Sequence, residues 1–172
     1  MSEHCLSNEV GGKLSMENIF LPIFRGKTVI VGIGNSLRGD DGFGPALIEQ
    51  LQGKVGCVCI DAGSAPEKFL GVIVKEEPDT ILFVDAADVE LEPGQYRILQ
   101  PADILKCGLT THDMSTRMLM EFLQSQTKAN ILMLGVQPQH VSLGKAMSPC
   151  LTETLDEIGM LIQEAGSCMR PI

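Results

Sequence analysis

Hydrophobic runs alternate with amphipathic stretches along most of this chain of 172 residues. Four apolar runs, rich in β-branched residues, predict strands buried on both faces. A shorter segment in which polar and apolar residues alternate predicts an edge strand with one solvated face. The buried strands are expected at residues 28–33, 55–60, 80–84 and 130–136, and the edge strand at residues 95–99.

The segments between these strands carry apolar residues at helical spacing, often behind a proline that suits a first helical turn. Helices are expected to begin near residues 42–45, at Pro66, at Asp113 and at Pro149. Strands that alternate with helices pair in parallel and are covered on both sides. The pattern therefore predicts an α/β fold, a three-layer sandwich with a mostly parallel twisted sheet of about five strands and helices on both faces.

The beginning of the chain differs from the rest. Residues 1–26 show no sustained hydrophobic period and contain Gly11 and Gly12 among polar residues, which is typical of a flexible leader. We expect residues 27–172 to form a single α/β domain, because the patterned part is of ordinary size for one core.

Charge and composition narrow the possible partners. The chain has 22 Asp and Glu against 13 Lys and Arg, a net charge of -9, which disfavours binding to nucleic acid. No apolar run reaches the roughly 18 residues of a membrane span, and the N-terminus lacks the basic start of a secretion signal. A cytoplasmic protein without membrane insertion is expected. The six scattered cysteines fit reduced thiols better than a disulfide framework.

The loop after the first strand is rich in glycine and resembles a dinucleotide site only superficially. Gly32, Gly34 and Gly39 miss the G-x-G-x-x-G spacing. Asp40 and Asp41 follow, where a pyrophosphate would need bare backbone N–H groups. A nucleotide-binding module is therefore a minor alternative, although an acid ends the second strand as it does in such folds.

Acidic residues follow three of the predicted strands. Asp41, Asp61 and Asp85 are expected at the carboxyl ends of strands, where ligand crevices of parallel sheets lie, and His112 precedes a predicted helix. Each alone could be a cap or a turn residue. Together, two carboxylates and one imidazole could bind a divalent metal, with Asp61 positioning a ligand or water or acting as a base. Spacing alone leaves these roles open.

Five motifs in this order resemble the hydrogenase maturation proteases. The resemblance rests on the motifs Gly32-Ile33-Gly34-Asn35-Ser36-Leu37-Arg38-Gly39-Asp40-Asp41-Gly42, Asp61-Ala62-Gly63-Ser64-Ala65-Pro66-Glu67, Val84-Asp85-Ala86, Thr110-Thr111-His112-Asp113-Met114 and Leu134-Gly135-Val136-Gln137-Pro138. The first, second and fourth motifs resemble the versions found in one branch of this family, the branch that serves the hydrogenase of formate hydrogenlyase-type complexes.

The resemblance implies an endopeptidase that removes a C-terminal extension from the large-subunit precursor of a nickel-iron hydrogenase after nickel insertion. It implies nickel carried by the substrate and no organic cofactor, and we expect a monomer. The alternative is a non-enzymatic nickel-binding assembly factor. The predicted site comprises Asp41, Asp85 and His112 as metal ligands, Asp61 and Asp40 as catalytic carboxylates, and Gly39, Gly42 and Thr111 in substrate binding.

Overall fold

A five-stranded sheet forms the middle layer of the fold. The computed structural model describes residues 18–104 and 111–167, apart from the side chains of residues 111–116. The strand order is β2-β1-β3-β5-β4, and only β4 is antiparallel to its neighbour. The strands are β1 (Thr28–Ile33), β2 (Val58–Gly63), β3 (Thr80–Ala86), β4 (Tyr96–Leu99) and β5 (Asn130–Val136).

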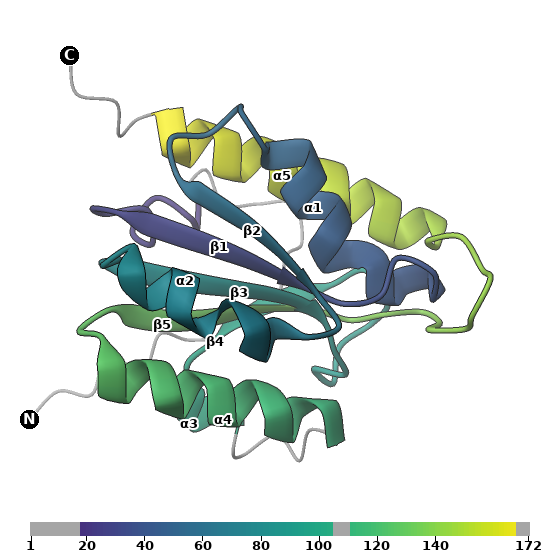
Figure 1. Ribbon diagram of the computed structural model, residues 1–172. Coiled ribbons are helices and arrows are strands. Elements are labelled where there is room, and N and C mark those ends of the chain that lie inside the picture. The colour runs from purple at the N-terminus through teal and green to yellow at the C-terminus, as the bar shows by residue number, and fades with distance from the viewer. Residues whose placement is uncertain (1–17, 105–110, 168–172) are drawn as a thin grey trace, which may run out of the picture.

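Helices cover both faces of this sheet (Figure 1). One layer consists of α1 (Phe43–Leu51) and α5 (Pro149–Ser167), and the other of α2 (Leu70–Lys75) and α4 (Thr111–Gln126) with the short α3 (Pro101–Ile104). Two 3-10 turns, η1 (Gly39–Gly42) and η2 (Pro66–Phe69), lead into α1 and α2. The three-layer α/β sandwich with a mostly parallel sheet is confirmed, including the antiparallel edge strand.

The alternation of side chains along the strands divides the core into two halves. In β3, Leu82 and Val84 pack into the half beneath α1 and α5. Ile81 and Phe83 pack into the half beneath α2 and α4. All four are fully buried, which explains why this strand reads as a continuous apolar run.

Two strands end later than the sequence predicts. The second strand is Val58–Gly63 instead of 55–60, and the third continues through Asp85 to Ala86. The parallel ladders cause both shifts, because Asp61 pairs with Gly32 and Asp85 with Gly135. Asp61 and Asp85 therefore lie within strands and not in the loops that follow them.

Helix α4 also differs from the prediction. It contains Thr111 and His112, whereas the sequence predicted a start at Asp113. His112 thus lies in the first described turn of the helix. The short helix α3 occupies part of a region for which the sequence predicted only a loop.

The packed domain begins before residue 27. Phe20, Ile23 and Phe24 are buried in the core half beneath α1 and α5, and the rings of Phe20 and Phe24 meet edge to face. The predicted leader boundary at residue 26 is therefore corrected for residues 18–26, whose aromatic side chains supply core volume that no helical period reveals. The predicted leader at residues 1–17 lies outside the described residues.

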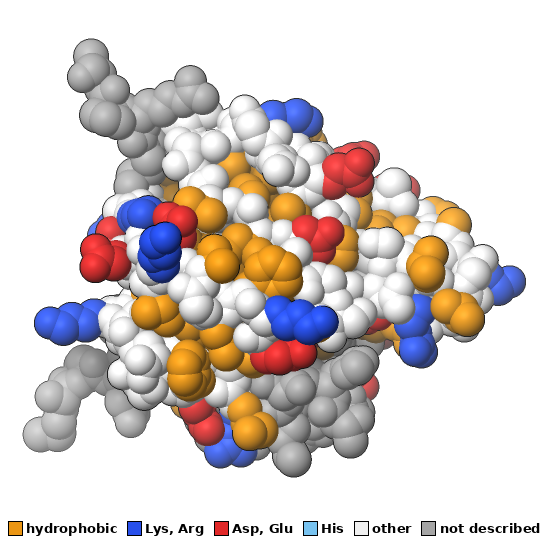
Figure 2. Space-filling model, in the orientation of Figure 1, with side chains coloured by type: hydrophobic (Ala, Val, Ile, Leu, Met, Phe, Trp, Pro, Cys, Tyr) orange, Lys and Arg blue, Asp and Glu red, His pale blue; other side chains and the backbone are white. Residues whose placement is uncertain are grey.

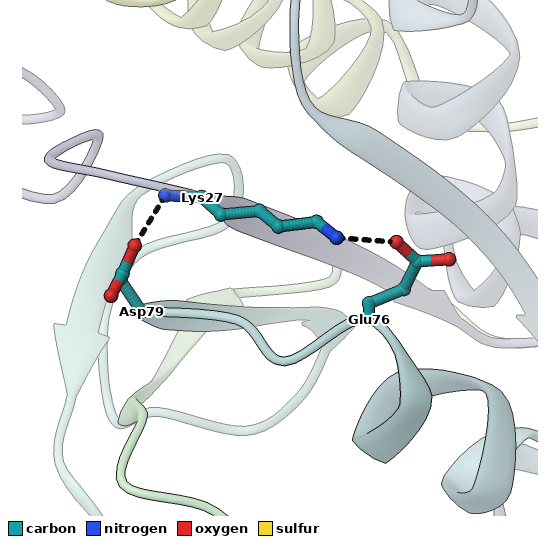
Figure 3. Close-up of polar contacts among 3 residues, drawn as sticks. All are labelled: Lys27, Glu76 and Asp79. Atoms are coloured by element: carbon teal, nitrogen blue, oxygen red, sulfur yellow. Dashed lines mark hydrogen bonds and ion pairs between the residues drawn. The ribbon is translucent and has the colours of Figure 1, made fainter.

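Polar contacts fasten the amino ends of β1 and β3 (Figure 3). The Lys27 backbone N–H donates to Asp79 Oδ2 at 2.7 Å, and Lys27 Nζ lies 2.9 Å from Glu76 Oε2. The ion pair is partly exposed, so it contributes at most about 1 kcal/mol. These contacts lie at the opposite edge of the sheet from the predicted site.

Candidate active site

The elements that carry the predicted site residues end or begin at the carboxyl edge of the sheet. The loop after β1 leads into η1, and η1 contacts β3. The long loop between β5 and α5 then crosses the same edge and approaches η1, as the chain path in Figure 1 shows. This arrangement follows from parallel strands, whose carboxyl ends all open at one edge.

Asp40 joins η1 to the loop between β5 and α5. Its side chain has no exposed surface. It accepts backbone N–H bonds from Ser148 at 2.6 Å, Gln139 at 2.7 Å and His140 at 2.9 Å. The Asp40 backbone N–H in turn donates to the His140 carbonyl oxygen at 3.1 Å. One carboxylate therefore fixes both ends of this long loop.

These hydrogen bonds also decide the charge of Asp40. Burial raises the pKa of this carboxyl, but the N–H groups of Ser148, His140 and Gln139 outweigh it, so the pKa lies below its ordinary value of 3.8. A catalytic base must reach water or substrate and take up a proton. The prediction of Asp40 as a catalytic carboxylate is therefore corrected to a structural role, because three donors occupy its oxygens inside the protein.

Asp41 differs from its neighbour. Its side chain is half-buried, and its Oδ2 accepts the backbone N–H of Asn35 at 3.0 Å. Within the described part of the chain, no donor forms a hydrogen bond to the other carboxylate oxygen, which leaves capacity for a ligand. The adjacent acids Asp40 and Asp41 thus perform different tasks.

Gly34 makes the position of Asp41 sterically possible. Gly34 has φ +137°, and a Cβ there would overlap the backbone carbonyl oxygen of Asp41. We expect Gly34→Ala to lower the free energy of unfolding by about 2 kcal/mol or more, since both strain and overlap must be relieved. Urea unfolding measures this loss. Gly71→Ala in α2 is the control, because a Cβ at Gly71 meets nothing within 4 Å; an equal loss in both variants would contradict the steric explanation.

Asp85 and the first turn of α4 share one side of the sheet. Asp85 is 7% exposed, and strand alternation places it on the same face as Phe83, beneath α2 and α4. Helix α4 leads back to the amino end of β5, so its first turn, which carries His112, lies toward the carboxyl edge. The side chains of His112 and Thr111 lie outside the described residues, and so their predicted roles stay predictions.

A complete metal-binding group is not visible among the described side chains. No cluster of three or more His, Cys, Asp or Glu side chains that could hold a metal occurs within them. The predicted set of Asp41, Asp85 and His112 includes one side chain outside that part of the structure. Its two carboxylates come from η1 and β3, which are in contact.

Asp61 lies on the other side of the sheet from Asp85. Its neighbours Ile60 and Ala62 belong to the core half beneath α2 and α4, so the Asp61 side chain is on the α1 side. It is exposed at the edge strand and accepts the Gly63 backbone N–H at 3.0 Å. The structure therefore separates Asp61 from Asp85 across the sheet.

Asp61 borders a cleft of about 390 Å³ between α1 and the loop that precedes α5. Gly39 and Gly42, predicted to bind substrate, also line it. Two acids, Glu49 and Asp61, and one base, Lys145, give it polar walls. The remaining lining residues are Ser36, Pro45, Ala46, Ile48, Gln52, Ala146 and Met147.

His140 is a residue of this edge that the sequence did not single out. Its Nδ1 is buried and has no hydrogen-bond partner within the described part of the chain. It lies against Gly39, which has φ +62° and whose Cβ, if present, would come within 2.8 Å of Nδ1. Gly39 thus makes room for this imidazole. The sequence feature that could have identified His140 is its position shortly after β5, which places it at the same sheet edge as the acids.

Known proteins with this fold and these motifs identify the family. The family model described as hydrogenase maturation protease matches residues 45–165. The hydrogenase 3 maturation protease of Escherichia coli strain K12 is 36% identical over 133 residues, which cover 76% of this chain and 85% of that protein. This chain belongs to the hydrogenase maturation protease family.

Solved structures agree with this assignment. The [NiFe] hydrogenase maturation protease HycI from Thermococcus kodakarensis KOD1 superposes with a TM-score of 0.80 at 31% identity, over 87% of this chain and 99% of that one. The endopeptidase HycI from Escherichia coli gives a TM-score of 0.71 at 32% identity, over 80% and 90% of the two chains. The chain is accordingly a peptide hydrolase. In its described residues, no helix is both long and apolar enough to cross a membrane.

Proposed function

We propose that this enzyme removes the C-terminal extension from the large-subunit precursor of a nickel-iron hydrogenase once nickel has been inserted. The family to which this chain belongs, and the similarity of the chain to a hydrogenase 3 maturation protease, support a hydrogenase subunit as the substrate. One observation carries the proposal. Turn η1, which bears Asp41, contacts β3, which bears Asp85, and the first turn of α4, which bears His112, lies toward the same edge of the sheet.

In this proposal Asp41, Asp85 and His112 grip the nickel that the precursor carries. Carboxylate and imidazole groups suit a borderline divalent ion, and two acids with one histidine leave positions for the ion's own ligands in the substrate. The absence of a cysteine in this set favours transient recognition over permanent retention. Only a nickel-loaded precursor then holds its tail in register with the enzyme, which explains how cleavage would wait for metal insertion.

The cleft beside α1 is the proposed place for the tail. Asp61 is the exposed carboxylate there, and of the two acids predicted as catalytic it is the one that water can reach. It would accept a proton from the water that attacks the carbonyl carbon and return it to the departing amine as the C–N bond breaks, so that the peptide bond is hydrolysed without a covalent enzyme intermediate. Glu49 adds a second negative charge, which favours a basic residue in the bound tail.

A single comparison tests this function. Purified enzyme is incubated with nickel-loaded and with nickel-free large-subunit precursor, and precursor length is followed on a gel and by mass spectrometry. We expect shortening of the nickel-loaded form only. Unchanged length in both samples would favour the non-enzymatic assembly factor, whereas equal cleavage of both would reject recognition through nickel.

A further inference from the structure

A small apolar surface lies beside the cleft. Leu37, Val141 and Leu143 are 69%, 42% and 74% exposed, and we call these three residues the apolar tip. Two exposed bases are close to them in the sequence: Arg38 directly follows Leu37, and Lys145 lies two positions after Leu143. Figure 2 shows hydrophobic side chains with Lys or Arg side chains around them at the right-hand end of the molecule, where Figure 1 places the loop between β5 and α5.

The apolar tip is built from two loops that are bonded to each other. The Gly144 backbone N–H donates to the Leu37 carbonyl oxygen at 2.8 Å. The Arg38 Nε and Nη2 atoms each lie 3.4 Å from the Val141 carbonyl oxygen. Beneath them, Asp40 fastens the second loop. The exposed side chains therefore stand on a fixed base, and such preorganisation lowers the entropy lost on binding.

The same two loops form walls of the cleft. Ser36 and Gly39 come from the first loop and η1, and Lys145, Ala146 and Met147 come from the second loop. A precursor whose tail occupies the cleft must place its folded body over the rim of that cleft. The apolar tip lies on this rim, because Leu37 stands between the lining residues Ser36 and Gly39, and Leu143 lies two positions before Lys145, which begins the lining segment of the second loop.

We infer that the apolar tip docks onto the folded body of the large-subunit precursor while the tail lies in the cleft. This inference rests on the proposed function. Arg38 and Lys145 give the tip a basic surround in a chain of net charge -9, so the complementary surface is apolar with acidic groups at its margin. The tip would thus make the enzyme bind the whole folded precursor more tightly than it binds the extension alone.

Another exposed apolar residue provides a matched control. Met160 on α5 is 65% exposed, close to the value for Leu37. Met160 does not line the cleft. Its helix, α5, packs beside α1 in the same layer. Substitution of Met160 removes about as much exposed apolar surface as substitution of Leu37 alone, and it does so without touching the rim.

The test compares Leu37→Ser/Leu143→Ser with Met160→Ser in two assays. The first measures kcat and KM for cleavage of nickel-loaded precursor. The second measures the Kd for the same precursor in an Asp85→Asn background, where the proposed loss of the nickel grip keeps the precursor intact. We expect KM and Kd to rise about tenfold in the double variant, with kcat unchanged, and all values to stay at the wild-type level in Met160→Ser.

The possible outcomes separate this inference from the proposed function. Wild-type enzyme that leaves nickel-loaded precursor uncut contradicts the proposed function, and the binding assay still decides whether the tip docks. Unchanged Kd and KM in the double variant, or an equal rise in Met160→Ser, would overturn the docking role. If the double variant unfolds at a lower temperature than wild type, Leu143→Asp alone replaces it, because an acid there both removes the apolar contact and repels the acidic margin. An unchanged Kd in that variant also overturns the inference.

Discussion

Replacing Asp40 by alanine is expected to lower the free energy of unfolding by about 3 to 5 kcal/mol, because it leaves three backbone N–H groups without their acceptor. These donors belong to Gln139, His140 and Ser148, and the oxygens that they contact have no exposed surface. Loss of this carboxylate should also release the loop between β5 and α5 from η1. Urea unfolding at neutral pH measures the change in stability.

The stabilisation by Asp40 should disappear in acid. Its pKa in the folded protein lies below the ordinary value of 3.8, so the folded state holds this carboxyl deprotonated at a pH where the unfolded chain protonates it. The contribution is therefore complete above about pH 4 and is lost as pH falls through the lower, folded-state pKa. The difference between wild type and Asp40→Ala should shrink below that point.

An exposed acid serves as the control for this prediction. Asp156 lies on the exposed side of α5, and Asp156→Ala removes the same functional group. We expect its effect on stability to stay within about 0.5 kcal/mol. A loss in Asp40→Ala no larger than in Asp156→Ala would contradict the structural role of Asp40 and would reopen its assignment as a catalytic carboxylate.

The division of labour between Asp40 and Asp41 could not be predicted from the sequence. Both stand in the same Gly-Asp-Asp-Gly turn, and both satisfy the preference for acids before a helix. What separates them is a loop about a hundred positions later in the chain, whose N–H groups reach Asp40. Local pattern contains no information on such a contact, whereas it predicts β1 and β5 at their observed bounds.

The positions of Asp61 and Asp85 show a second limit. The sequence correctly indicates that both lie near strand ends, because apolar runs precede them. Which face each side chain takes depends on the pleat and on where the strand begins, and a shift of one residue reverses it. In the observed registers Gly32 pairs with both Asp61 and Val84, so Asp61 shares the face of Val84 and Asp85 takes the opposite one.

This separation changes how the carboxylates divide the proposed reaction. Asp41 and Asp85 lie on contacting elements and are the carboxylates proposed to bind the nickel, whereas Asp61 borders the cleft on the α1 side, where the tail is proposed to lie. Turn η1 connects the two regions, since Gly39 and Gly42 at its two ends line the cleft and Asp41 lies between them. A substrate can therefore present its metal and its tail to the two sides of one turn.

Replacing Asp41 by asparagine is expected to slow cleavage of nickel-loaded precursor by at least about 100-fold while the fold stays intact. The amide oxygen can still accept the Asn35 N–H, so the local backbone keeps its hydrogen bond. The neutral amide is a much weaker ligand for a divalent ion than a carboxylate is. Initial rates of precursor shortening measure the loss, and thermal unfolding checks that the variant is folded.

Two further variants distinguish loss of a ligand from a general loss of charge. Asp156→Asn removes one acid from α5 and should cleave at the wild-type rate. Asp41→Glu keeps a carboxylate on a longer arm and should recover part of the rate that Asp41→Asn loses. Wild-type rates in Asp41→Asn would exclude Asp41 from the nickel grip, and an equal loss in the Asn and Glu variants would point to a steric role for this position. Partial rescue by glutamate would identify charge and oxygen donation as what the site requires at this position.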